Sequence, residues 1–111
     1  MAATHKLLSS GQLGDDVTSD AAIYDPSSGK TGMIKTIVLH NMNTSGTPEV
    51  AEIFFNGTAD STRMLNVSLA AGETFEWSVG HMIVMLDAEL LKGQSTTASK
   101  VNYFIFGAEE A

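Results

Sequence analysis

The chain has 111 residues, no cysteine and a formal net charge of −7, with 13 acidic side chains against 6 Lys and Arg. This length predicts one domain built on one hydrophobic core. The lack of cysteine excludes disulfides, thiolate metal sites and cysteine nucleophiles, and the acidic balance disfavours binding to nucleic-acid phosphates or to anionic membranes.

The first 20 residues predict an N-terminal arm, with a candidate first strand at Lys6 to Leu8, and residues 21–111 predict a β domain. Met1 to Ser10 contain neither the basic nor the apolar segment of a secretory signal peptide. No stretch reaches the roughly 20 apolar residues of a membrane span. We therefore expect a protein that is made and folded in a cytoplasm and does not enter a membrane.

Two segments in the middle of the chain alternate between apolar and polar residues, as half-buried strands do. They are Arg63 to Leu69 and Thr74 to Val79, and the second carries Trp77 on its apolar side. The short connection Ala70 to Glu73 predicts a hairpin between them. The same alternation predicts that Trp77 lies in the core.

Other runs are apolar on both faces, and no amphipathic helix is present to cover a second face. These runs are Met33 to His40, Val50 to Phe55, Met82 to Leu86 and Val101 to Phe106, with shorter candidate strands at Ala22 to Tyr24 and Glu89 to Leu91. A second sheet or another subunit must then cover them. The expected fold is all-β, a β-sandwich or jelly roll of about eight short antiparallel strands with an N-terminal arm.

One motif suggests phosphate binding but is incomplete. Ser28 to Thr31 has the Gly-Lys-Thr ending of a phosphate-binding loop, yet Tyr24 stands where that motif needs a glycine, and no helix follows. We expect a turn at this position and no cofactor.

No pattern of side chains predicts a metal or a catalytic site. The three histidines share no ligand spacing, and the acidic residues Asp15, Asp16 and Asp20 lack the alternating pattern of a calcium loop. Glu73 and Glu76 would face opposite sides of a strand, so they cannot act as a catalytic pair. We expect neither a metal nor an enzymatic activity.

Several segments in a fixed order resemble a known family over nearly the full chain. They are Leu7 to Leu13, the turn Tyr24 to Thr31, the strand Ile34 to Asn41, the connection Leu69 to Trp77 and the last strand, Val101 to Glu110. This arrangement is similar to that of small β-sandwich virion proteins of tailed bacteriophages.

The resemblance implies a structural protein of the virion, and we expect a capsid decoration (cement) protein that stabilises the head shell. The implied partners are copies of the chain itself, with a trimer favoured, and the major capsid protein or other virion proteins. The expected interface consists of the second faces of the doubly apolar strands and the arm: His5, Lys6, Leu7, Leu8, Met33, Phe54 and Met85.

Two alternatives remain open from the sequence. One is a tail, neck or fibre-associated subunit. The other is a carbohydrate-binding β-sandwich for host recognition, in which Trp77, Tyr24 and Tyr103 would be exposed stacking platforms.

Overall fold

The computed structural model describes residues 5–111, apart from the side chains of Val79 and His81. In that part of the chain the predicted all-β class is confirmed, and the only helical element is a single 3-10 turn, η1 (Asp60–Thr62). The strands are β1 (Lys6–Gln12), β2 (Thr31–Asn41), β3 (Glu49–Phe55), β4 (Arg63–Leu69), β5 (Thr74–Met85), β6 (Leu91–Ser95) and β7 (Val101–Glu110).

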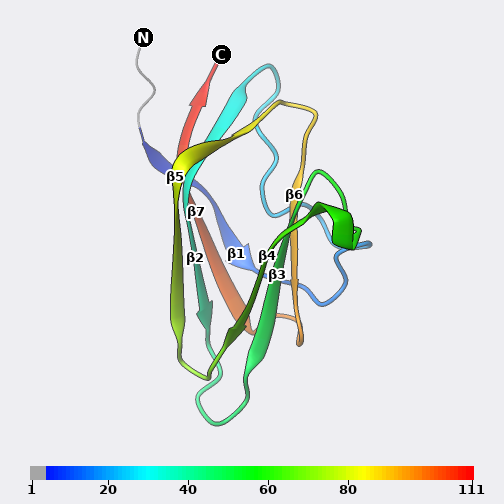
Figure 1. Ribbon diagram of the computed structural model, residues 1–111, viewed down its shortest axis with the longest axis vertical. Helices are drawn as coiled ribbons and strands as arrows, with labels where there is room; N and C mark the ends of the chain where they lie inside the picture. Colours follow the sequence, from blue (N-terminus) through cyan, green and yellow to red (C-terminus); the bar gives the residue numbers. More distant parts are fainter. Residues whose placement is uncertain (1–4) are drawn as a thin grey trace.

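The strands form two antiparallel sheets that face each other, one ordered β1-β7-β2-β5 and the other β4-β3-β6 (Figure 1). The first and last strands are neighbours, and most successive strands lie in opposite sheets, which is the order of a jelly roll. Ala22 to Tyr24 does not form the expected strand. Only Tyr24 pairs there, in an isolated bridge with Leu91 beside β6, where an eighth strand would lie.

The prediction of a hairpin through Ala70 to Glu73 is wrong. The connection is tight, but it passes from β4 in one sheet to β5 in the other. Asn41, at the end of β2, explains this path, because its main-chain N–H donates to Glu73 and its side chain donates to the carbonyl oxygen of Leu69. The main-chain bond keeps the start of β5 beside β2 in the four-stranded sheet. The side-chain bond holds the end of β4 in the other sheet.

The division into an arm (residues 1–20) and a separate domain also needs correction. The candidate first strand exists as β1, which pairs with β7 along its length. Beyond it, Leu13 and Val17 are 0% and 5% exposed. Residues 5–20 are therefore part of the sandwich, whereas Met1 to Thr4 lie outside the described residues.

Bulges determine which residues face the core. The pairing of β2 shifts between Ile34 and Thr36 against both of its neighbours. Because a one-residue shift reverses the alternation, Ile34 and Ile37 are both buried although simple alternation places them on opposite faces. A second irregularity lies in β5, between Ser78 and Ile83.

The hydrophobic core fills the space between the two sheets. Its main cluster comprises Leu13, Ile23, Tyr24, Ile34, Ile37, Leu39, Ala51, Ile53, Leu69, Met85, Leu91, Val101, Tyr103 and Ile105. Phe75 and Trp77 of β5 pack against this cluster and are half-buried. The predicted orientation of Trp77 toward the core is thus confirmed.

Candidate functional site

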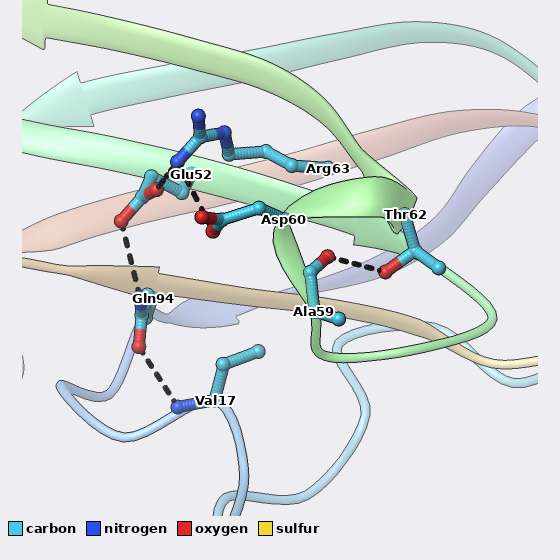
Figure 2. Close-up of polar contacts among 7 residues, drawn as sticks. All are labelled: Val17, Glu52, Ala59, Asp60, Thr62, Arg63 and Gln94. Carbon is cyan, nitrogen blue, oxygen red and sulfur yellow. Dashed lines mark hydrogen bonds and ion pairs between the residues drawn. The ribbon is translucent and has the colours of Figure 1, made fainter.

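The outer face of the three-stranded sheet is polar, and its side chains bind one another. Arg63 of β4 forms an ion pair with Glu52 of β3 at 2.7 Å, and Gln94 of β6 donates to the same carboxylate at 3.0 Å (Figure 2). The main-chain N–H of Val17 donates to Gln94 in turn, at 3.0 Å. These contacts link β3, β4, β6 and the segment after β1. Glu52, Arg63 and Gln94 on this face therefore already have partners within the chain.

The outer face of the four-stranded sheet is different, because large apolar side chains lie open on it. The exposed fraction is 47% for Leu7, 45% for Met82, 54% for Val84, 38% for Phe104 and 39% for Phe106. Met33 and Val38 of β2 are half-buried among them. A soluble monomer seldom shows a large continuous apolar patch, and such patches commonly mark interaction sites.

The strand register brings these side chains together in pairs across neighbouring strands. Leu7 lies opposite Phe106, Val38 lies opposite Phe104, and Met33 lies opposite Val84. Side chains opposite each other on adjacent strands have Cβ atoms about 5 Å apart. We call this surface the apolar outer face and define it as Leu7, Met33, Val38, Met82, Val84, Phe104 and Phe106.

Polar pairs occupy the opposite end of the same sheet. His40 lies 2.9 Å from the Thr74 hydroxyl through its Nδ1 atom, and Gln12 donates to Asn102 at 3.3 Å. The sheet therefore presents an apolar area over the start of β1, the middle of β7 and the end of β5, and a polar area where β2 ends and β7 begins.

The predicted interface residues divide into two groups. Leu7 and Met33 belong to the apolar outer face, His5 and Lys6 are exposed beside it, and Leu8 is half-buried against the core. Phe54 and Met85 are 2% and 0% exposed, so neither can offer an interface, and their prediction is wrong.

Each of the two failures has a local cause. Met85 follows the irregularity in β5 and belongs to the core cluster between the sheets. Phe54 lies outside that cluster, opposite Arg63 and Lys92 in the three-stranded sheet, and is covered by the chain itself.

The sequence prediction missed the other members of the apolar outer face, which are Val38, Met82, Val84, Phe104 and Phe106. The available signal in β7 was the unbroken apolar run Tyr103 to Phe106, which places apolar side chains on both faces of the strand. Sequence periodicity does not state which of the two faces is the outer one.

A shallow hollow of about 320 Å³ lies between β1 and the segment that precedes β2. On its wall Tyr24 donates to Glu109 at 2.7 Å, and Ser27 donates to the same carboxylate from its main chain and its hydroxyl, each at 3.1 Å. Burial, followed by the Glu109 carboxylate, raises the pKa of Tyr24. Burial also acts to raise the pKa of Glu109, but the hydrogen bonds from Tyr24 and Ser27 and the charge of Lys6 outweigh it and lower that pKa. The carboxylate therefore fastens this segment to β7.

The Gly-Lys-Thr segment forms the expected turn. Lys30 donates its main-chain N–H to the Ser27 carbonyl at 2.9 Å, and Gly29 has a φ of 76°. The Gly29 N–H donates to the Asp87 carboxylate at 2.9 Å. An amide that a phosphate-binding loop would offer to its ligand is thus already bonded.

The acidic residues after β1 organise their own loop. The Asp16 carboxylate accepts hydrogen bonds from Thr18 and from the N–H and hydroxyl of Ser19. Within residues 5–111, leaving out the two undescribed side chains, no group of three His, Asp or Glu residues is placed to hold a metal ion. No helix in the described part of the chain is long and apolar enough to cross a membrane.

The stacking platforms of the carbohydrate-binding alternative are not exposed as that alternative requires. Tyr24 and Tyr103 are 4% and 8% exposed. Trp77 packs against the core. Neither tyrosine offers the open ring face on which a sugar stacks.

Comparison of this chain with known protein families, with curated proteins and with solved structures finds no significant match.

Proposed function

We propose that this chain is a structural protein of a bacteriophage virion, a capsid decoration (cement) protein that attaches to the head shell through the apolar outer face. The observation that carries this proposal is the group of exposed apolar side chains on the outer face of the four-stranded sheet. Covering such a surface with a partner removes apolar area from water, which is favourable by about 25 cal/mol per Å². The sequence resemblance supplies the class of partner.

The rest of the molecule supports a passive, structural role. On the outer face of the three-stranded sheet Glu52 bonds to Arg63 and Gln94, and the Glu109 carboxylate beside the hollow is already bonded to Tyr24 and Ser27. A partner would therefore gain the most free energy of binding by covering the apolar outer face. A fold alone does not define a function, so the proposal depends on this surface rather than on the jelly-roll order.

The test is a binding titration of the purified protein onto empty shells assembled from the major capsid protein of the same phage. We expect saturable attachment. The variant Val84→Glu should bind at least about 10-fold more weakly, because it places a charge inside a contact that excludes water. The matched variant Val50→Glu changes a 40% exposed valine on the other sheet, and it should bind like the wild type.

Two results would contradict the proposal. One is the absence of saturable attachment, and the other is equal binding by Val84→Glu and the wild type. Attachment to isolated tails and not to shells would support the tail-associated alternative.

A further inference from the structure

The four-stranded sheet has a free edge at β5 in the described part of the chain. The N–H of Asn41 donates to the Glu73 carbonyl at 3.0 Å, where β2 meets the start of β5. In an antiparallel pair every second residue bonds to the neighbouring strand, and the others turn their N–H and C=O groups away from it. Counting from Glu73, the groups that turn to the free edge are those of Thr74, Glu76 and Ser78.

Within residues 5–111, β1 forms the opposite edge and has the same character. Leu13 donates its N–H to the Val101 carbonyl at 2.9 Å, so this residue bonds toward β7. By the same alternation Ser10 and Gln12 turn their backbone groups away from the sheet. Both side chains are exposed. An unpaired edge of this kind is a template for another strand.

The two edges are matched in direction. Each strand of this sheet runs antiparallel to its neighbours, so β1 and β5, first and fourth in order, run in opposite directions. A second copy placed beside the first, with its β1 against β5, would therefore pair antiparallel. The sheet would continue across the contact, and both apolar outer faces would lie on the same side.

The side chains along the two edges are also complementary. In this pairing Ser10 and Gln12 meet the polar start of β5. The irregularities of the two strands lie outside this contact, between Leu7 and Ser9 in β1 and between Ser78 and Ile83 in β5. The exposed Leu7 then lies toward the end of β5 that carries Met82 and Val84. Apolar side chains meet apolar ones, and polar side chains meet polar ones.

Charge selects this pairing over one between two β5 edges. The start of β1 carries Lys6 and no acidic residue, whereas β5 carries Glu76 and is followed by Asp87. Two β5 edges paired antiparallel would place the start of each strand against the end of the other, which brings Glu76 of one copy toward Asp87 of the next, and like charges on adjacent strands are destabilising. Pairing β1 with β5 instead brings Lys6 toward Asp87.

We propose that copies of this chain associate head to tail, with the β1 edge of one copy adding to the β5 edge of the next. This proposal rests on the proposed assembly role and names a partner for it. A repeated head-to-tail contact gives a closed ring when its rotation closes and an open filament when it does not. In either form the apolar outer faces are presented together to a larger surface.

The test uses light scattering after size exclusion on two variants, each blocked at one edge. Ser10→Pro removes an outward N–H from β1, and Glu76→Pro removes one from β5, at positions where proline is tolerated in an edge strand. We expect assemblies for the wild type, single chains for each variant alone, and dimers and nothing larger for a 1:1 mixture. The mixture forms dimers because each variant keeps the edge that the other has lost.

Three results would overturn the proposal: a wild type that stays a single chain up to about 1 mM, assembly of Ser10→Pro alone, or a mixture that stays monomeric while the wild type assembles. Circular dichroism of each variant reports its folding. Lys6→Glu and Asp87→Lys give a second test without proline. Each alone should lose assembly through like-charge contact, and their 1:1 mixture should regain assemblies larger than dimers, because both of its contacts again join opposite charges.

This test is separate from the test of the proposed function. If the chain stays monomeric but binds shells through the apolar outer face, only the head-to-tail contact is wrong. If Ser10→Pro and Glu76→Pro mix to dimers but the wild type does not bind shells, the proposed function is wrong and the head-to-tail contact stands.

Discussion

The side-chain amide of Asn41 donates to the main-chain oxygen of Leu69 at 3.0 Å, which joins the end of β2 in one sheet to the end of β4 in the other. The same amide donates to the Thr47 carbonyl at 3.0 Å, and its oxygen accepts from the Asn43 N–H at 3.0 Å. Asn41 is 0% exposed. One buried side chain therefore fixes two of the connections that pass between the sheets.

Replacing Asn41 with Ala should lower the free energy of unfolding by about 2 to 4 kcal/mol, because several buried backbone groups lose their partners. Asn102→Ala is the control, since the side chain of this half-buried residue accepts a hydrogen bond from the exposed Gln12 side chain, and the change should cost less than about 1 kcal/mol. Urea denaturation measures both. Equal losses would contradict the role of Asn41 as a link between the sheets.

The Glu109 carboxylate should make stability fall in acid. Its pKa is lowered in the folded state, so its contribution is complete above the ordinary value of 4.5 and is lost as the pH falls through the folded-state value. Thermal unfolding between neutral pH and the acid range measures this loss. Glu109→Gln should show less of it, and so should Tyr24→Phe, which lacks one of the hydrogen bonds to the carboxylate. Unchanged pH dependence in Glu109→Gln would refute this assignment.

Gly107 stands where a side chain has no room. It lies opposite Ile34 at the bulge of β2, and a Cβ atom there would overlap the main-chain oxygen of Met33. Gly107→Ala should therefore lower the free energy of unfolding by more than about 2 kcal/mol. Gly80→Ala is the matched control, because nothing lies near its Cβ position. Similar melting temperatures for the two variants would show that β2 and β7 can move apart at the bulge without loss of stability.

Most of the fold could be predicted from local patterns. Alternation at Arg63 to Leu69 and at Thr74 to Val79 identified strands, and the absence of an amphipathic helix identified the class. The order of the strands could not be predicted in the same way. The predicted hairpin at Ala70 to Glu73 is wrong because the path of the chain there depends on the hydrogen bond from Asn41 to Leu69. That bond joins residues 28 positions apart, so no local pattern in the sequence indicates it.

The candidate site was predicted only in part, for a related reason. Two apolar faces were visible in Met33 to His40 and in Val101 to Phe106, but the bulge at Ile34 and Thr36 reverses the alternation within β2. Leu7 and Met33 were identified, whereas the buried Met85 was placed on the wrong side. Bulge positions depend on pairing with distant strands, and that information is not local in the sequence.

The central claim is that a partner covers the apolar outer face when the protein is at work. Oxidation of methionines, followed by mass spectrometry with and without empty shells, tests this claim most directly. In the free protein Met82 and Met42, which are 45% and 39% exposed, should oxidise, while Met85, at 0%, should not. On shells we predict that Met82 becomes protected and that Met42, beyond the polar end of the sheet, stays reactive. Equal oxidation of Met82 in the free and the shell-bound protein would contradict the account.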